Sequence, residues 1–520
     1  MNKTLRIIAT TIAPLPILAS VMFAGTANAA ANPLVAVPDN VNPAVIHSAK
    51  LGELAVNKPV SVAVSLKLRD NAGLHKFLSD VSNPHSAQYR HFLTPAQFTA
   101  RYGPTKAEIA TVTSFLAGHG LTVKPVRANS QVVDATGTAG QIEQTFGTRL
   151  GVYKQGGKTF YANETAPALP ATVAGAITGV AGLDNHGTRK AHNVKATARP
   201  LTAGGYGPSD LASAYSVSGL GQGSGVSVAL WEFDGYQSSN ISAYDSNYGL
   251  NSSTPTTVSV DGANYDSSPG QGQGEVELDI EVVNAMAPSA STYVYEAPNS
   301  DQGQIDMAAQ IASDDKVSVT SISWGQCETQ STPATLTSTD SALAQGTAEG
   351  ISYYSASGDS GSDDCQDGST AVDYPASSPD VAGTGGTTLN GPGSESAWSG
   401  SGGGVSAVYS SRNVPDVSAD ADPNTGYAIY SAGSWQVYGG TSCAAPLWAG
   451  ITALFDAQSG KKLGNPDTAY ANIGNGSSYS SAFNDITSGS NGSFSAGPGY
   501  DNVTGWGSPI ASGLYTALGL

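Results

Sequence analysis

Short segments of alternating and amphipathic character fill the first 185 residues. Apolar side chains alternate with other residues over 60–68, the period of a half-buried strand. A helix is predicted over 71–81, and a second one begins after the capping box at 105–108. Residues 121–136 resemble a hairpin and 139–146 a further short helix. This mixture predicts a small α+β domain over residues 30–185.

From about residue 204 the pattern changes to strands that alternate with helices. The continuous apolar run Val226–Phe233 is typical of a strand buried in a parallel sheet. Further elements are expected as strands over 292–295, 317–324 and 351–355, and as helices over 275–286, 308–313, 342–350 and 442–458. This alternation predicts an α/β fold with a doubly wound parallel sheet over 204–520. Active sites of such sheets lie at the carboxyl ends of strands, here after Phe233, Trp324 and Ser355.

The N-terminus has the pattern of a secretory signal over residues 1–29. Lys3 and Arg6 precede an uncharged apolar run over 7–25, and Ala27-Asn28-Ala29 fits a cleavage site with small residues. A membrane anchor is the alternative, since the run is nearly long enough to span a bilayer. Two prolines and the cleavage site favour removal. We therefore expect a secreted, extracellular protein without a membrane segment once the signal is removed.

Residues 186–203 are basic, rich in turn formers and without periodicity. Such a segment is typical of an exposed linker that a protease can cut.

Charge is distributed unevenly along the chain. Residues 204–520 hold 32 Asp and Glu but four Lys and Arg, a formal charge of −28, whereas the first 203 residues carry +10. A total of −18 argues against nucleic-acid binding, which needs clustered basic side chains. Three cysteines exclude a disulfide-built scaffold and a four-cysteine zinc site.

All seven histidines lie in the first 203 residues. A nucleophilic hydroxyl within 204–520 therefore has to use a carboxylate as its proton acceptor.

One candidate nucleophile is Ser442, at the start of an apolar helix whose N-terminus favours negative charge. The alternative is that Ser442 only caps this helix. Ser360, in Gly358–Gly361, imitates the serine motif of trypsin-like proteases, but those need a histidine and a β-barrel.

Four carboxylates lie within seven residues of the helix over 275–286. Glu275 and Asp279 share one helix face, and Glu277 and Glu281 share another. Either pair could share a proton, or the helix could simply present a solvated acidic face. Periodicity does not choose between these interpretations.

Four motifs in order resemble the sedolisin (serine-carboxyl peptidase) family, in particular its kumamolisin-like members. They are Gly-Glu-Val-Glu-Leu-Asp-Ile-Glu-Val from 274, Ser-Ile-Ser-Trp-Gly from 321, Ser-Gly-Asp-Ser-Gly from 357 and Gly-Gly-Thr-Ser-Cys-Ala-Ala-Pro from 439. Asn83-Pro84-His85-Ser86 and Leu93-Thr94-Pro95 resemble the family's activation prodomain. The resemblance implies a ferredoxin-like prodomain over 30–185, a linker with the processing site over 186–203, and a subtilisin-like peptidase domain over 204–520.

The resemblance also implies roles for six residues: Ser442 as nucleophile, Glu275 as general base, Asp279 beside that base, Asp359 as oxyanion donor, and Glu232 with Trp324 as an outer hydrogen-bonded pair. A carboxylate with an ordinary pKa of ~4 works best as a base near that pH. Asp359 has to be protonated to donate a hydrogen bond to an oxyanion. Together these roles predict an acid-active enzyme.

The resemblance further implies a single Ca²⁺ site near the C-terminus. Its ligands would be the carboxylates of Asp485 and Asp501 with the backbone carbonyls of Ile486, Gly497 and Gly499. Such hard oxygen ligands suit calcium.

Two of the three cysteines follow predicted active-site strands and loops. A disulfide between Cys327 and Cys365 is expected in an exported protein. Cys443, beside Ser442, is either a small buried residue or a reactive thiol.

The sequence therefore predicts a secreted, acid-active serine-carboxyl endopeptidase that hydrolyses protein and peptide bonds through an acyl-serine intermediate. We expect an autoprocessed zymogen, monomeric, with its own prodomain as intramolecular inhibitor. The charge asymmetry suggests that the prodomain adheres at neutral pH and loosens as carboxylates protonate. The alternatives are a glycosidase with a carboxylate pair, an exported binding protein, and a degenerate, inactive peptidase.

Overall fold

The computed structural model describes residues 33–38, 40–126, 131–196 and 204–520. The predicted signal over 1–29 and the end of the linker, 197–203, lie outside the described residues. Within these described ranges, no helix has the length and apolar character needed to cross a membrane.

A four-stranded antiparallel sheet forms the centre of the N-terminal region, in the order β4-β5-β3-β9. Its apolar face packs against the helices α3 and α4, which both begin with a capping box, at Thr105 and Thr138. The elements of this sheet are β3 (Pro59–Leu66), α3 (Lys106–Gly118), β4 (Thr122–Val123), β5 (Val132–Thr138), α4 (Ala139–Phe146) and β9 (Ile177–Ala181). Numbered along the chain, these strands lie in the order 2-3-1-4, that of a ferredoxin-like domain.

Smaller elements complete the N-terminal region. They are β1 (Leu34–Ala36), β2 (Ala49–Glu53), α1 (Asn71–Ser82), α2 (Pro95–Arg101), β6 (Leu150–Gln155), β7 (Lys158–Asn163), β8 (Ala168–Pro170) and α5 (Ala171–Ala176). Strands β2, β6 and β7 form one further sheet, and β1 pairs with β8.

The C-terminal region contains an eight-stranded sheet in the order β13-β14-β12-β15-β17-β19-β20, with β23 also paired to β19. All pairings are parallel except that of β20. The strands are β12 (Ser227–Glu232), β13 (Thr256–Ser259), β14 (Ser291–Glu296), β15 (Val319–Ile322), β17 (Ser352–Ala356), β19 (Ala382–Leu389), β20 (Glu395–Ala397) and β23 (Val417–Asp420). The α/β fold with a doubly wound, largely parallel sheet is thus confirmed.

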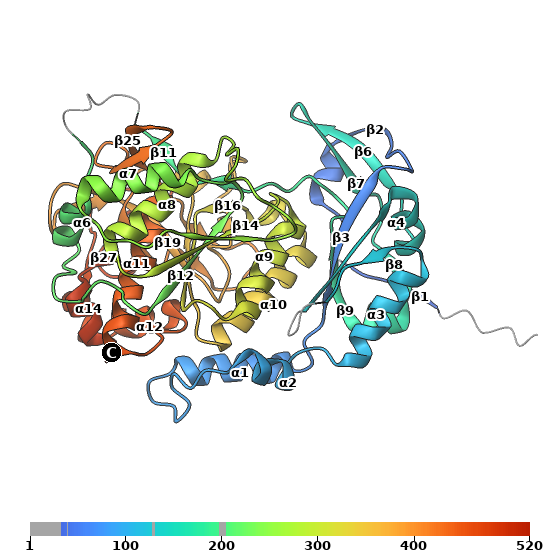
Figure 1. Ribbon diagram of the computed structural model, residues 1–520, viewed down its shortest axis with the longest axis horizontal. Helices are drawn as coiled ribbons and strands as arrows, with labels where there is room; N and C mark the ends of the chain where they lie inside the picture. Colours follow the sequence, from blue (N-terminus) through green and yellow to red (C-terminus); the bar gives the residue numbers. More distant parts are fainter. Residues whose placement is uncertain (1–32, 39, 127–130, 197–203) are drawn as a thin grey trace, which may run out of the picture. The chain divides into compact units, whose positions relative to one another are not determined.

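Side chains of the central strands point alternately into two cores. Val228 and Leu230 of β12 pack with the helices α8 (Gln273–Met286) and α11 (Thr441–Ser459). Ala229 and Trp231 pack instead with α9 (Asp301–Asp314) and α10 (Pro333–Ala348), which lie side by side in Figure 1. Burial on both faces explains why β12 lies in a continuous apolar run of the sequence.

The strand predicted over 317–324 is in fact two strands. β15 ends at Ile322, and β16 (Trp324–Cys327) pairs with β18 (Asp373–Tyr374) in another sheet. Because of the break at Ser323, its carbonyl oxygen belongs to neither sheet. It accepts hydrogen bonds from the Ser442 hydroxyl and the His192 N–H instead.

The interpretation of 186–203 as an exposed linker is wrong for its described part. β10 (Lys190–Ala191) pairs with β16, and β11 (Val194–Lys195) pairs with β25 (Ser434–Gly439). Arg189 and His192 are consequently 3% and 6% exposed. Composition alone could not indicate this, because the strand partners lie more than 100 residues away.

Further elements of the C-terminal region surround the sheet. They are α6 (Pro208–Ala214), α7 (Ser238–Tyr248), β21 (Gly404–Val405), β22 (Asn413–Val414), β24 (Tyr427–Ser431), α12 (Pro466–Gly474), α13 (Tyr479–Ala482), β26 (Phe483–Asn484), β27 (Ser508–Pro509) and α14 (Ala511–Ala517).

Candidate active site

Ser442 lies in the first turn of α11, completely buried. The residue before the helix, Gly440, has φ of 100°, a conformation that favours glycine. The Ser442 hydroxyl donates a hydrogen bond to the carbonyl oxygen of Ser323 at 3.3 Å. Ser442 therefore faces the end of β15, at the carboxyl edge of the parallel sheet.

The carboxyls of Glu275 and Asp279 face this serine from α8, and both residues are fully buried. Glu275 Oε2 accepts a hydrogen bond of 2.6 Å from the side-chain amide of Asn193, and the Ser442 hydroxyl is close enough to Glu275 to favour its charged form. Asp279 Oδ1 accepts a hydrogen bond from the Ser323 hydroxyl at 2.7 Å. The structure thus brings Ser442, Glu275 and Asp279 into one buried cluster.

Glu232, the last residue of β12, is a further carboxyl in this cluster. The Trp324 indole N–H donates to Glu232 Oε2 at 2.7 Å, and the Glu232 carboxyl shares a hydrogen bond with Asp279. A hydrogen bond between two carboxyls needs a proton on one of them. Glu232 and Asp279 therefore form a pair that retains a proton.

Burial raises the pKa of Glu275, Asp279 and Glu232 well above the usual range of carboxyls. Repulsion from neighbouring carboxylates adds to this rise, while hydrogen bonds from Ser442 and Asn193 oppose it for Glu275. The expectation that the base has an ordinary pKa is therefore wrong for the precursor, because water is excluded from the cluster.

Asp359 follows β17 and lies beside the turn that leads into α11. Its Oδ1 accepts hydrogen bonds from the backbone N–H and the hydroxyl of Thr441, at 2.7 and 2.9 Å. Its buried Oδ2 has no partner among the described residues. Burial raises the pKa of Asp359 to about 7, although the neighbouring His192 and hydrogen bonds from Thr441 oppose the rise. Below that pH, Oδ2 is free to carry a proton and donate it.

The carbonyl oxygen of His192 lies against this donor and against the nucleophile. The Ser442 N–H donates to His192 O at 2.9 Å. A methyl group on Gly440 would collide with that oxygen and would lie 2.6 Å from Asp359 Oδ2, so glycine keeps this pocket open. The His192 carbonyl oxygen thus accepts a hydrogen bond from the Ser442 N–H and lies near the Asp359 carboxyl, which is the setting of an oxyanion hole.

Residues 190–196 cross the site as an extended segment. The His192 N–H donates to Ser323 O at 3.0 Å, and the Ala196 N–H donates to Val437 O at 2.9 Å. The His192 ring lies 3.0 Å from a carboxylate oxygen of Asp373. The chain thus lies across its own nucleophile in the manner of a peptide substrate.

Sequence reasoning missed His192, Asn193 and Ser323 as members of this site. It counted His192 among the histidines of the N-terminal region and concluded that an imidazole was remote from the chemistry. Nothing in the linker's composition marks His192 or Asn193, and no signal in the sequence marks Ser323, which lies inside the strand predicted over 317–324.

The second acidic pair of α8 has a different environment. Glu277 accepts hydrogen bonds from Gln237 N–H, Asn240, Gln273 and Ala432 N–H, at 3.0, 2.7, 2.9 and 3.3 Å. Glu281 accepts a bond from the Tyr430 N–H at 2.8 Å. These carboxyls hold α7 and the β24–β25 hairpin, so the solvated-face interpretation is wrong for both pairs.

The residues expected to hold Ca²⁺ lie together near the C-terminus. Asp485 accepts hydrogen bonds from the Gly499 N–H at 3.1 and 3.2 Å, and Asp501 accepts one from the Gly497 N–H at 3.0 Å. Among the described residues, the carbonyl oxygens of Ile486, Gly497 and Gly499 accept no hydrogen bond. Two carboxylates joined by a glycine loop with free carbonyls fit a hard cation.

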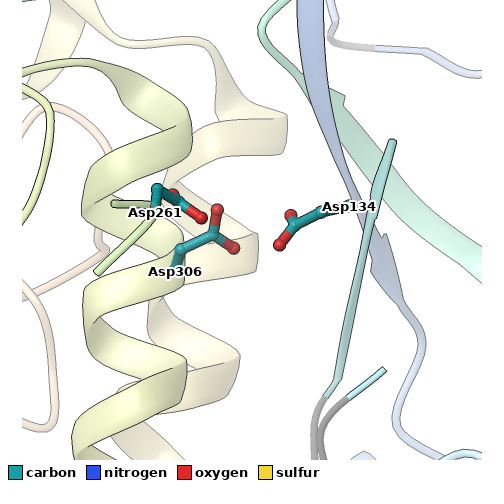
Figure 2. Close-up of side chains that lie close together, drawn as sticks. All are labelled: Asp134, Asp261 and Asp306. Atoms are coloured by element: carbon teal, nitrogen blue, oxygen red, sulfur yellow. The ribbon is translucent and has the colours of Figure 1, made fainter. Parts of the chain in front are cut away.

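Another acidic cluster, absent from the sequence reasoning, consists of Asp134, Asp261 and Asp306. Figure 2 shows their carboxyls pointing toward one another, from β5, the turn after β13, and α9. One ligand atom from each lies within 4.8 Å of the others. Lys124 supplies positive charge there, with its ammonium 2.9 Å from Asp261 and 3.9 Å from Asp134. The cluster is therefore an ion-pair contact between the N-terminal and C-terminal regions.

The cysteines lie as follows. Cys327 and Cys365 form a disulfide that joins β16 to the loop after Asp359. Cys443 is free and fully buried, and burial raises the pKa of its thiol. A buried thiol held in its protonated form is inert.

Comparisons with known proteins agree with this geometry. The activation domain of pro-kumamolisin matches residues 47–186, and the subtilase family matches residues 177–507. Sedolisin of Pseudomonas sp. (strain 101) is 33% identical, over 94% of this chain and 93% of its own. Kumamolisin of Bacillus sp. (strain MN-32) is 32% identical, over 90% and 93%.

A solved structure shows the same fold. Pseudomonas sedolisin, a serine-carboxyl proteinase complexed with two molecules of pseudo-iodotyrostatin, superposes with a TM-score of 0.55 at 30% identity. The superposition covers 60% of this chain and 97% of that chain.

Proposed function

Because the chain belongs to the sedolisin family of serine-carboxyl peptidases, we propose that it is a secreted, acid-acting endopeptidase that cuts itself free of its prodomain. The family makes the chain a serine-type peptidase with an activation prodomain. The observation that carries the finer proposal is the position of the His192 carbonyl oxygen, held by the Ser442 N–H at 2.9 Å beside Asp359.

The proposed reaction begins at the peptide bond between His192 and Asn193. The Ser442 hydroxyl attacks the His192 carbonyl carbon and passes its proton to Glu275. The Ser442 N–H and protonated Asp359 stabilise the negative charge that develops on the carbonyl oxygen. Glu275 then protonates the departing Asn193 nitrogen, which leaves His192 as an acyl group on Ser442.

Water completes the cycle. It enters as the new N-terminal segment departs, gives a proton to Glu275 and attacks the ester carbonyl. The bond to Ser442 then breaks, Glu275 passes the proton to the Ser442 oxygen, and the His192 carboxyl group is released. Asp279 and Glu232 support Glu275 through their shared proton, which keeps a second negative charge away from it. In the mature enzyme, protein and peptide substrates would take the place of residues 190–196.

Acid action follows from the protonation of Asp359. Because its pKa is raised to about 7, this donor is lost in alkali. The dissociation of the prodomain also depends on carboxylates, since basic residues of the N-terminal region pair with acidic ones of the peptidase domain.

Acid stability supports the same proposal. Burial raises the pKa of several carboxyls to about 7 or 8: Asp359, Asp373, Asp380, Asp456, Glu296 and Glu349. In the unfolded chain these groups titrate near ~4. Between these values the folded chain binds more protons than the unfolded chain, so the free energy of unfolding falls as pH rises. We expect the melting temperature of the Ser442→Ala precursor to decrease from pH 4 to pH 8.

Calcium is proposed as a structural ion held by Asp485, Asp501 and the carbonyls of Ile486, Gly497 and Gly499. When bound, it would neutralise the two carboxylates and tie the glycine loop down. We expect a chelator to lower the melting temperature of the wild-type precursor and to leave that of an Asp501→Asn variant unchanged.

The central experiment incubates the purified precursor at acid pH and identifies the products by mass spectrometry. Wild type is expected to yield a new N-terminus at Asn193, whereas Ser442→Ala stays intact. Ser360→Ala is the matched control, since it removes the hydroxyl of the exposed serine beside Asp359 and should process normally. An intact wild-type chain, or processing that survives in Ser442→Ala, would contradict the proposal and favour a binding protein.

A further inference from the structure

Arg189 is almost completely buried in the peptidase domain, an unusual place for a linker arginine. Its Nη2 donates to Asp301 Oδ1 at 2.6 Å, and its Nε donates to Gln304 Oε1 at 2.6 Å. The side chains of Arg189 and Asp301 are 1% and 4% exposed. Both acceptors belong to the first turn of α9.

Separate groups hold the backbone at this position. The side-chain amide of Asn299 accepts a hydrogen bond from the Arg189 N–H at 2.7 Å and donates one to the Arg189 carbonyl oxygen at 2.8 Å. These two bonds can form with any residue except proline. Selection for the arginine side chain therefore has to come from Asp301 and Gln304.

The acceptors are themselves held in place. Gln304 donates through its amide nitrogen to the Thr339 hydroxyl at 3.1 Å, which leaves its oxygen directed at the arginine. Thr335 of α10 donates to the second oxygen of Asp301 at 3.4 Å. Asp184, Lys158 and His186 also lie near Asp301, but Thr335 and Thr339, which hydrogen-bond to Asp301 and Gln304, belong to the peptidase domain and remain after the prodomain leaves.

The strand register of residues 190–191 fixes the position of Arg189 relative to Ser442. β10 pairs with β16 through Lys190 opposite Gly325 and Ala191 opposite Trp324, which sets His192 at the nucleophile. Arg189 is then the fourth residue before the bond that is cut.

We propose that Asp301 and Gln304 form an arginine-specific subsite for the fourth residue before the cleaved bond of peptide substrates. This inference rests on the proposed peptidase function and deepens it. The substrates it selects are peptides and proteins with arginine at that position, and in the precursor Arg189 fills the same subsite.

Arginine fits better than lysine because two acceptors lie at two different nitrogens of one planar group. The point charge of a lysine ammonium cannot reach both in the same geometry. Citrulline keeps the shape of arginine without its charge, so it separates the contribution of Asp301 from that of packing.

The test uses wild-type enzyme matured at acid pH and internally quenched decapeptides with the sequence of residues 187–196. The residue at the position of Arg189 is arginine, lysine, citrulline or leucine, and mass spectrometry confirms the cleaved bond. We expect kcat/KM to be about 10- to 100-fold higher for arginine than for leucine, the size of a charge-assisted hydrogen bond to a buried partner. Lysine and citrulline should fall between them.

Two variants locate the preference. Asp301→Asn should lose most of the arginine preference and retain the rate on the leucine peptide. Asp315→Asn, which removes the same charge at the other end of α9, should behave like wild type.

The outcomes separate this inference from the proposed function. Equal kcat/KM for the four peptides overturns the subsite, as does an Asp301→Asn variant that slows all peptides alike or an Asp315→Asn variant that loses the preference. Failure of wild type to cleave any of the four, together with an unprocessed precursor, contradicts the peptidase proposal instead.

Discussion

Glu275 and Glu277 are two residues apart on α8, and both are fully buried. Glu277 has four hydrogen-bond donors around it, which come from α7, its own helix and the β24–β25 hairpin. Glu275 accepts a hydrogen bond from the side-chain amide of Asn193, and its Oε1 atom has no hydrogen-bond partner among the described residues. On one face of α8, the glutamate carboxyl thus accepts four hydrogen bonds. On the other face, one oxygen of the glutamate carboxyl accepts none.

The difference teaches how to separate structural from chemical carboxyls in this protein. A buried carboxylate whose oxygens are bonded to backbone and amide donors stabilises the loops that provide them. A buried carboxyl that keeps one oxygen open beside a hydroxyl can exchange a proton. An oxygen without a partner is not sufficient by itself, because Glu281 Oε1 also lacks one among the described residues; the Ser442 hydroxyl beside Glu275 makes the difference.

The largest expected effect is that of Glu275→Gln. The variant keeps the shape of the side chain and loses the proton acceptor, so we expect kcat to fall about 10³- to 10⁴-fold. The rate of precursor processing at acid pH measures this, with far-ultraviolet circular dichroism as the check on folding. Processing within tenfold of wild type would show that another group accepts the proton.

Asp359→Asn should change the pH profile rather than abolish activity. Wild-type activity is expected to fall about tenfold per pH unit above pH ~7, as Asp359 loses the proton that it donates. An asparagine amide donates at every pH, so the alkaline fall should be absent from the variant. Peptide hydrolysis by the acid-matured enzymes between pH 5 and 9 measures both profiles, and an unchanged alkaline limb would assign it to another group.

Glu277→Gln should act on stability and leave the chemistry intact. It weakens the hydrogen bonds to α7 and the hairpin, at a cost of about 1–3 kcal/mol in the free energy of unfolding. Thermal unfolding of the precursor, in the Ser442→Ala background, measures the loss. The processing rate of Glu277→Gln at 25 °C should stay within about threefold of that of wild type. A loss of rate as large as that of Glu275→Gln would show that both carboxyls take part in the reaction.

The smallest effect is expected for Lys124→Met, at the acidic cluster of Figure 2. Its ammonium pairs with Asp261 while the side chain stays 38% exposed, so the pair contributes about 0–1 kcal/mol. At neutral pH and low salt, the cleaved prodomain should leave the variant enzyme a few-fold faster, and high salt should remove the difference. Recovery of peptidase activity after dilution measures this release.

Lys76→Met is the matched control, because Lys76 pairs with Asp80 inside the prodomain. If salt leaves the release of the wild-type prodomain unchanged, charge attraction does not explain latency.

The sequence by itself determined the α/β class, the order of the main strands and helices, and the family. An apolar run marked β12, because a strand buried on both faces contains few polar residues. The sequence predicted α9 and α10 too short, as 308–313 and 342–350, because Asp301, Gln302 and Gln304 give the first turn of α9 a polar sequence although they are buried.

The motifs also named Ser442, Glu275, Asp279 and Asp359, since each lies in a short, distinctive run. Helical periodicity alone could not decide between the two acidic pairs of α8, because it treats both faces alike. Contacts with residues far away in the sequence, such as Asn240 and Ala432 for Glu277, make that decision.

Only the tertiary structure decided what lies in the cleft. Residues 189–196 have no pattern of their own, and their conformation comes from β16, β25 and Asn299, which lie at least 100 residues away in the chain. A local sequence can specify a helix or a buried strand because the pattern lies within it. It cannot specify a strand whose hydrogen bonds and buried charge are all supplied by distant partners.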